Sequence, residues 1–384
     1  YTSEYWNEIP MIDESKQNDE LTASILNKLK NIKVLLSDCV GELEKYESFF
    51  DKNTTIPNEV VALTHYEVFS EQLKLSLDIF TSLFDDAATF SKSIGYHEAK
   101  GFLFKIEPID VGSSVFEEVL LKAESTVMTS ATLVGNGGIG GAGVYWMTGH
   151  NNLDKEKRFS QILTLPPVFD YQNKAKVFLS HDLPGMNQIE FVPELLNKVL
   201  PLVRELDGKT LFLFSSKMRF EIAREILLEK ISATIPVFSQ GLGIKAVDDF
   251  KKASKGILIG MESFGEGIDI PGDKLQLVII DKIPDVRFDL VTQKRRDFYE
   301  SHFGNEFIDY FMSIRARKLL QKLGRLLRTN TDYGCAIVVD ARLKSWKGRT
   351  MAQLKDLLSP YHAEILPIDK SIEETRKFLL EDKK

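Results

Sequence analysis

Residues 321–328 read Gln321-Lys322-Leu323-Gly324-Arg325-Leu326-Leu327-Arg328 and follow an apolar repeat that predicts a helix. Arg325 and Arg328 stand three residues apart, so on a helix both side chains point the same way. Gly324 leaves room for another surface to come close, and two guanidinium groups suit bidentate contact with phosphate oxygens. By itself the octapeptide fits a solvent-exposed basic helix face better. Motifs elsewhere in the chain favour the phosphate interpretation.

The composition is that of a soluble globular protein with room for two or three domains: 384 residues, of which 43% are hydrophobic and 27% charged. The formal net charge of −7 gives no overall attraction to nucleic acid, so such binding needs a local groove. Cys39 and Cys335 are too few for a disulfide framework, a four-cysteine zinc site or an iron–sulfur cluster. The sequence has neither a membrane-length apolar run nor a signal-peptide pattern. We expect a cytoplasmic protein without a membrane partner, and Tyr1 in place of Met indicates a fragment.

Residues 1–95 differ from the rest because two long amphipathic repeats dominate them. The first repeat lies within Leu21–Phe49, and the second runs from Tyr66 to Phe84. Their apolar residues recur at intervals of three and four, which predicts two helices. The turn-rich stretch Asp51–Asn58 separates them, so we expect an antiparallel helical hairpin in a small all-α domain.

From about residue 100, short apolar strands alternate with helices. These strands have little polar alternation, which is typical of a parallel sheet with helices on both faces. The expected strands are Gly101–Ile106, Ser125–Thr129, Thr210–Phe214, Ile235–Phe238, Gly256–Met261, Leu275–Asp281 and Cys335–Asp340, and the expected helices are Val115–Lys122, Val192–Leu206, Met218–Lys230, Ala246–Ala253 and the helix into Arg328. Leu165–Gln188 is expected to be irregular, and a capping box of Ser371 and Glu374 predicts a last helix over Ile372–Glu381. The fold class is therefore α/β, preceded by a small helical domain.

A glycine-rich run at residues 135–143 follows the strand expected at Ser125–Thr129. A loop of this kind cradles phosphate where it joins a strand to the N-terminus of a helix. Neither Lys-Ser nor Lys-Thr follows these glycines, so we expect a flexible connection.

Polar motifs follow several expected strands, at the edge where an open parallel sheet binds ligands. They are Thr129-Ser130-Ala131-Thr132, Ser215-Ser216-Lys217 and the stretch from Glu262 to Gly272, while the arginine stretch precedes Cys335–Asp340. Short hydroxyl side chains and free backbone amides suit a sugar–phosphate backbone, and the glycines around Glu266 let a ligand approach closely. The two arginines would supply charge to a transferring phosphoryl group. Each motif alone is weak, but four in this order predict a site for nucleotide and nucleic acid.

Residues from about 100 to 345 resemble the C-terminal part of DinG-type, XPD-like superfamily 2 DNA helicases. The matching stretches are Thr129–Leu133 (motif III), Phe214–Ser216 (motif IV), Phe264–Gly272 with Leu275–Pro284 (motif V and its downstream strand), Gln321–Arg328 with Thr331–Gly334 (motif VI), and the further landmark Pro166–Tyr171. The resemblance implies a RecA-like second motor domain over residues 135–384. It also implies that residues 96–134 end the first motor domain, and that residues 1–95 form a helical arch or part of one.

The resemblance further implies roles for individual residues. Arg325 and Arg328 would be arginine fingers on the γ-phosphate of ATP, with Gln321 beside them as a further catalytic residue. The cofactor-binding residues would be Glu266, Gly267, Asp269 and Gly324. The residues near single-stranded DNA would be Thr129, Ser130, Thr132, Ser215, Ser216, Ser263 and Phe264. Such enzymes move 5′ to 3′ on single strands as two motor domains close and open around ATP.

The sequence departs from a complete motor in its ATP-binding half. Its Gly208-Lys209-Thr210 enters a strand and lacks the upstream glycine of a phosphate-binding loop, and Asp-Glu-x-His does not occur. We therefore expect ATP and Mg²⁺ to be held mostly by an N-terminal motor domain of the same protein. The chain alone is expected not to hydrolyse ATP. Asp285 also stands where the family has an aromatic residue after Lys-Ile-Pro.

Two other functions stay open at this point. The chain could be a non-catalytic clamp on single-stranded nucleic acid, or the helicase-like part of a DinG-type exonuclease. The intact pair of Arg325 and Arg328 favours the motor over the clamp, since a clamp needs no γ-phosphate contact. The six histidines lack metal-ligand spacing, and no serine has an obvious histidine partner, so we expect neither a metal site nor a hydrolytic triad.

Overall fold

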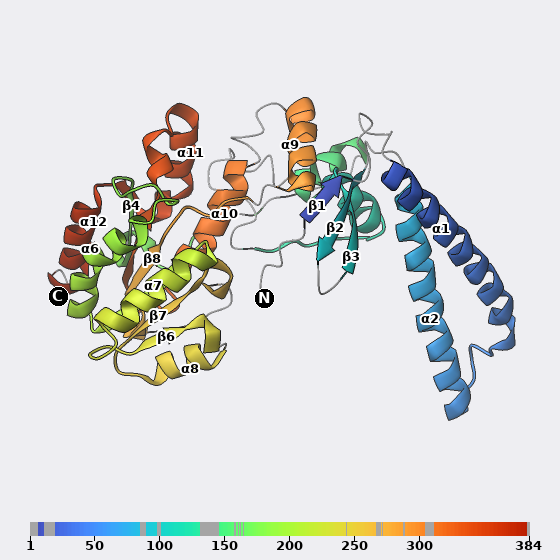
Figure 1. The fold of residues 1–384 in the computed structure, drawn as a ribbon, viewed down its shortest axis with the longest axis horizontal. Helices are drawn as coiled ribbons and strands as arrows, with labels where there is room; N and C mark the ends of the chain where they lie inside the picture. Colours follow the sequence, from blue (N-terminus) through green and yellow to red (C-terminus); the bar gives the residue numbers. More distant parts are fainter. Residues whose placement is uncertain are drawn as a thin grey trace. The chain divides into compact units, whose positions relative to one another are not determined.

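The structure is a computed structural model. It describes residues 7–10, 20–84, 90–97, 101–130, 146–156, 159, 161, 163, 165–242, 244–265, 270, 272–286, 289–303 and 311–381. The glycine-rich run and the predicted site residues Thr132, Glu266, Gly267 and Asp269 lie outside these ranges. The chain forms two compact units, residues 1–122 with 287–304 and residues 123–286 with 305–384 (Figure 1).

The predicted helical hairpin is present in the first unit as α1 (Glu20–Tyr46) and α2 (Pro57–Ser82). The Phe50 ring, just beyond α1, stacks on Tyr66 of α2 with centroids 4.6 Å apart. The Tyr66 hydroxyl donates a hydrogen bond of 3.1 Å to the Leu43 carbonyl. The predicted hairpin is therefore confirmed.

The first unit also contains a three-stranded antiparallel sheet, in the order β1 (Asn7–Pro10), β2 (Phe90–His97) and β3 (Gly101–Pro108). The predicted strand Gly101–Ile106 is β3, but its partners are antiparallel. The predicted helix Val115–Lys122 begins earlier, as α3 (Val111–Val115), and ends as a π-helical turn over Phe116–Leu120. Helix α9 (Leu290–Phe303) joins this unit, because the Arg295 guanidinium donates to the Pro108 carbonyl at 2.9 Å.

The second unit is built on a seven-stranded parallel sheet in the order β10-β4-β9-β8-β5-β7-β6. Its strands are β4 (Ala175–Ser180), β5 (Gly208–Phe214), β6 (Val237–Ser239), β7 (Gly256–Met261), β8 (Leu277–Ile280), β9 (Gly334–Val339) and β10 (Glu364–Ile365). Its helices are α5 (Tyr171–Lys174), α6 (Phe191–Glu205), α7 (Lys217–Lys230), α8 (Ile244–Lys252), α10 (Met312–Leu323), α11 (Gly348–Leu357) and α12 (Ile368–Arg376). All neighbouring strands in this sheet run parallel.

Helices cover both faces of this sheet, as the apolar strands predict. Successive side chains of a strand point to opposite faces, so Phe212 and Phe214 of β5 join one core cluster and Leu211 and Leu213 join the other. The first cluster includes residues of α6, α7 and α12, and the second includes residues of α8, α10 and α11. The predicted α/β fold with a RecA-like parallel sheet is confirmed.

The expectation of a buried strand at Ser125–Thr129 is wrong. These residues form no strand and are exposed, with Val127 exposed by 85%. A segment forms a buried strand only where neighbouring strands pair with it, and no described strand pairs with this one.

Two further differences lie near β4, which the sequence assigned to an irregular stretch. Asp170 caps the short helix α5 by accepting the Asn173 amide, and β4 follows at once. The predicted capping box is also wrong, because α12 begins at Ile368 and Ser371 lies inside it, 2.8 Å from the Ser180 hydroxyl. Asp182 accepts the Ile368 amide instead, so the cap comes from another part of the chain.

Candidate functional site

Ser215, the first residue after β5, is anchored by a buried ion pair. Its backbone amide donates to the Asp281 carboxylate at 2.9 Å, and Asp281 lies just beyond β8. The Arg219 Nε donates to the other oxygen of Asp281 at 2.7 Å, and Asp281 is 1% exposed. Burial raises the pKa of Asp281, and the nearby guanidinium of Arg219 opposes that rise. The pair therefore fixes the predicted DNA-contacting residue Ser215 at the sheet edge.

Ser216 is the residue from which α7 starts, and its side chain makes no capping hydrogen bond. Ser216 is half-buried, whereas Lys217 is exposed. The first amides of a helix have no partner within the helix and attract anions. The Ser215 hydroxyl donates to Asp281 at 3.4 Å, so the donors placed for a phosphate group are the Ser216 hydroxyl and the first amides of α7.

The predicted motif V residues begin where β7 ends, in a short 3₁₀ turn over Glu262–Gly265. The Phe264 ring covers Gly260, since a Cβ on Gly260 would come within 2.2 Å of Phe264 Cδ1. Phe264 is consequently half-buried against the core instead of standing free for base stacking. Burial raises the pKa of Glu262, while the Lys322 ammonium, 3.8 Å away, opposes this. Ser263 lies in the same turn.

The arginine stretch lies beyond its helix, which corrects the prediction that Arg325 and Arg328 project from a helix. Helix α10 ends at Leu323, and Gly324 has an ordinary φ of −60°. The Asp332 carboxylate accepts the Arg328 amide at 2.7 Å. Both arginines are half-buried. They lie in a tight loop that the Asp332 carboxylate holds in shape. Helical periodicity in the sequence could not predict this loop.

Tyr171, the last residue of the landmark Pro166–Tyr171, lies within electrostatic reach of Arg328. The Arg328 charge acts on the Tyr171 hydroxyl, whose pKa is raised by burial and lowered in part by Tyr361 and Arg328. The rings of Tyr171 and Tyr361 lie 4.8 Å apart between centroids. Tyr171 therefore packs against Tyr361 within electrostatic reach of Arg328.

The structure places the predicted site residues in separate groups. Ser215, Ser216, Ser263 and Phe264 lie where β5 and β7 end. Arg325 and Arg328 lie in the loop that leads into the start of β9, and Gln321 is exposed on the last turn of α10. Thr129 and Ser130 are exposed in the segment without a strand.

Asp285, the departure from the family pattern, is the centre of a charged network that sequence reasoning missed. Arg315 of α10 donates to one carboxylate oxygen at 2.6 Å, and Arg342 donates to the other at 2.5 Å. Lys282 also lies 3.1 Å from this carboxylate. Burial favours a higher pKa for Asp285, but Arg315, Arg342 and Lys282 outweigh it and hold the pKa well below its usual range. The only sign of this network in the sequence was an acidic residue at a position where an aromatic residue was expected.

We expect Asp285→Asn to lower the free energy of unfolding by about 2 kcal/mol at neutral pH, because charged hydrogen bonds are lost. The folded state depresses the pKa of this carboxyl, so its stabilisation is present above the unfolded-state pKa of about 4 and is lost as the pH falls. Urea unfolding of both proteins between pH 7 and pH 3 tests this. The difference between them should shrink below about pH 4. Asp369→Asn, at an exposed carboxylate, is the control, and an Asp285→Asn difference independent of pH would contradict the assignment.

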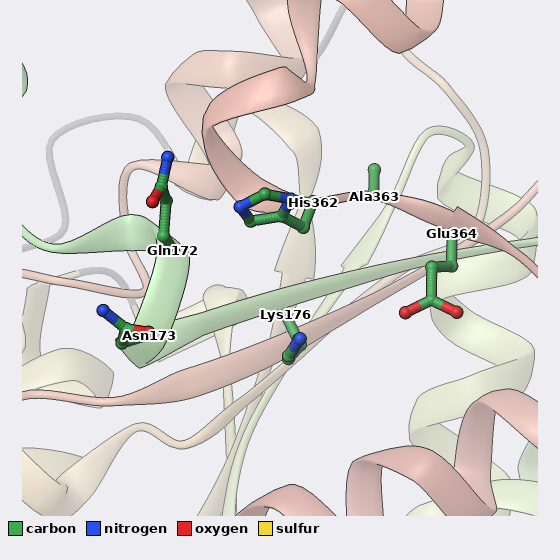
Figure 2. Close-up of a pocket in the computed structure, with 6 residues that line it drawn as sticks. All are labelled: Gln172, Asn173, Lys176, His362, Ala363 and Glu364. Carbon is green, nitrogen blue, oxygen red and sulfur yellow. The ribbon is translucent and has the colours of Figure 1, made fainter.

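A hollow of about 550 Å³ lies beside the start of β4 and the strand β10, lined by Gln172, Asn173, Lys176, His362, Ala363 and Glu364. Figure 2 shows these side chains pointing in different directions, without a shared focus. Within the described residues, no group of three or more His, Cys, Asp or Glu side chains is placed to hold a metal ion. None of the described helices is both long and apolar enough to cross a membrane.

Comparison with known proteins shows that the chain is similar to helicases. The family model of the helicase C-terminal domain matches residues 199–358. The ATP-dependent DNA helicase YoaA of Escherichia coli (strain K12) is 28% identical over 249 residues, which cover 64% of this chain and 37% of that protein. The ATP-dependent DNA helicase DinG of Photobacterium profundum is 30% identical over 255 residues, 63% of this chain and 35% of that protein.

The solved structure titled "XPD_Helicase" matches 83% of this chain and 57% of its own, with a TM-score of 0.47 and 13% identity. The sequence relatives carry the assignment, and the chain spans little more than a third of the length of the curated relatives it matches. The matched residues 199–358 include β5, β7, β8, β9 and the loops that hold Ser215, Phe264, Asp285 and Arg328. Residues 199–358 therefore match a helicase C-terminal domain, and the chain is similar to the DinG and YoaA ATP-dependent helicases.

Proposed function

We propose that this chain supplies the second motor domain of an ATP-dependent DNA helicase that moves 5′ to 3′ along single-stranded DNA. The observation that carries the proposal is the anchoring of Ser215 by the buried pair of Asp281 and Arg219. This anchor uses both the amide and the hydroxyl of Ser215, and it positions the start of α7, where Ser216 and the first amides of the helix can donate to a backbone phosphate. The curated relatives are named ATP-dependent DNA helicases, which agrees with this chemistry.

In this proposal single-stranded DNA crosses the edge where β5 and β7 end. Ser215, Ser216 and Ser263 contact its backbone, and Thr129, Ser130 and Thr132 contact it from the segment after residue 123. Phe264 acts by shaping the turn, since its ring covers Gly260. Backbone contacts of this kind hold a strand without reading its sequence.

The nucleotide contacts come from the other residues of motifs V and VI. Arg325 and Arg328 place guanidinium groups on the γ-phosphate, with Gln321 and Gly324 beside them. Glu266, Gly267 and Asp269 join the nucleotide to motion between the motor domains. ATP and Mg²⁺ are held mostly by an N-terminal motor domain, so this chain alone is not expected to hydrolyse ATP. Residues 135–384 form the second motor domain, 96–134 complete the first, and 1–95 belong to a helical arch.

Fluorescence anisotropy of a labelled single-stranded oligonucleotide, titrated with the chain across a range of salt concentrations, tests the DNA track. We expect affinity to fall with salt, and a slope of about −2 in the logarithmic plot would correspond to roughly three neutralised phosphates. A duplex of the same length should bind more weakly. The double variant Arg325→Ala/Arg328→Ala should bind the single strand as the unchanged chain does, because these arginines act on nucleotide.

Two results would contradict the proposal. If the chain showed no salt-sensitive binding of the single strand, DNA would not be bound along this sheet edge. Loss of binding in the double arginine variant would mean that these arginines hold DNA, and the nucleotide assignment would be wrong. Arg224→Ala, at a half-exposed arginine on α7 that pairs with Glu221, is the matched control for removing positive charge.

A further inference from the structure

A second hollow, of about 420 Å³, lies where β4 and β9 end. Gly185 to Gln188 line it from the loop after β4, and Ala341 and Arg342 line it from the turn after β9. The Arg219 Nη1 donates to the Met186 carbonyl at 3.0 Å. Since Arg219 also pairs with the carboxylate that anchors Ser215, the hollow is joined directly to the proposed DNA track.

The loop around the hollow is held in shape by its own hydrogen bonds. The Gly185 amide donates to the Gln188 side-chain oxygen at 2.9 Å, and the Gln188 amide donates back to the Gly185 carbonyl at 2.8 Å. The Asn187 side chain is exposed beside it. Ile189, the next residue in the chain after Gln188, is 77% exposed. The hollow thus has a fixed backbone and an amide side chain in its lining.

The chemistry of Arg342 favours a flat, uncharged ligand over a phosphate group. Its Nε donates to Asp340 at 3.0 Å, its Nη1 to Asp285, and its Nη2 to the Ile283 carbonyl and to Asp340. These partners occupy most of its N–H donors and neutralise its charge. The guanidinium also lies over the Trp346 ring, 5.6 Å from its centroid, so what remains for a ligand is the opposite face, a surface on which nucleic-acid bases stack.

We propose that this hollow receives one base of the single-stranded DNA whose backbone passes Ser215 and Ser216, with Asn187 bonding to the edge of the base. The inference rests on the proposed function, because it needs the strand to follow this sheet edge. A base held here would add stacking to the phosphate contacts. It would also fix the register of the strand relative to α7.

The test fills the hollow with a larger side chain and measures whether the bases of the strand still contribute to its affinity. A Cβ on Gly185 would approach Gln188 no closer than 3.8 Å, so Gly185→Leu fits the backbone and places its side chain at the hollow. Anisotropy compares a short oligothymidine strand with an abasic strand of the same length. We expect Gly185→Leu to weaken oligothymidine binding about tenfold, the scale of one stacked base. Binding of the abasic strand should change little.

Gly241→Leu is the matched control, because a Cβ there meets only the Ser239 hydroxyl at 3.9 Å and the site lies beyond β6, at the other side of the sheet. Asn187→Ala is a second variant, at an exposed side chain, and should also narrow the preference for oligothymidine. An unchanged preference in both variants would overturn the base site, and so would equal weakening on both strands. If the unchanged chain bound neither strand, the proposed function itself would fall.

Discussion

Replacing Arg325 or Arg328 by alanine is expected to lower ATP hydrolysis by roughly three to five orders of magnitude in a protein that joins this chain to a first motor domain. An arginine finger neutralises charge that develops on the transferring phosphoryl group, and an alanine leaves that charge uncompensated. Arg328 is suited to this task because the Asp332 carboxylate accepts its backbone amide and fixes the loop that carries it. Single-turnover ATP hydrolysis measures the effect.

Lysine at the same positions tests whether ATP hydrolysis needs only the positive charge or also the shape of the guanidinium group. Arg325→Lys and Arg328→Lys keep the positive charge but lose the planar fork that contacts two oxygens, so hydrolysis should stay low. Arg224→Ala should hydrolyse ATP at the unchanged rate. If either alanine variant hydrolysed ATP at a near-normal rate, the arginine replaced in it would not be a γ-phosphate contact. Oligonucleotide affinity measured in parallel shows whether the loss belongs to nucleotide or to DNA.

Breaking the buried ion pair should have the largest effect on stability. Asp281→Ala or Arg219→Ala leaves one buried charge without its partner, which we expect to cost about 3–5 kcal/mol in the free energy of unfolding. The exposed pair of Arg376 and Glu205 supplies the control, since Arg376→Ala should cost less than about 1 kcal/mol. Urea unfolding measured with one protocol compares the variants. Equal costs at the two pairs would contradict the buried role of Asp281.

The double variant Arg219→Met/Asp281→Leu separates stability from positioning. Replacing a buried pair by apolar residues of similar volume often leaves stability unchanged. The Ser215 amide would nevertheless lose its acceptor, so we expect affinity for single-stranded DNA to fall even where the protein is as stable as before. Unchanged affinity in a stable double variant would mean that this anchor does not serve DNA binding.

Much of the second unit could be predicted from its strands. Thr210–Phe214, Gly256–Met261 and Cys335–Asp340 are apolar at nearly every position, because both faces of each strand are covered by helices. The helical hairpin was equally clear, since its apolar residues repeat with the helical period. Buried side chains leave a periodic pattern that the sequence displays directly.

The segments that failed carry no such pattern. Ser125–Thr129 has strand-forming residues yet is exposed, because a strand depends on pairing partners that the local sequence does not specify. Strand β2 was missed because Ser91, Lys92 and Ser93 are buried polar residues, and Lys92 satisfies its ammonium with the Leu83 carbonyl. Ser371 matched a capping motif but packs against Ser180, and Asp182 supplies the cap.

The sequence by itself determined the parallel sheet, the helices on its faces and the resemblance to DinG-type helicases, since apolar periodicity and short motifs are local properties. Tertiary structure alone decided how the motifs work. Asp281, Arg219 and Ser215 meet only because β5 and β8 are neighbours in the sheet, and Asp285 gathers cations from α10 and from the turn after β9. The loop that carries Arg325 and Arg328 took its shape from Asp332 and not from helix propensity. Charged groups act over a few ångströms in space, whatever their separation along the chain, so their partners appear only once the chain has folded.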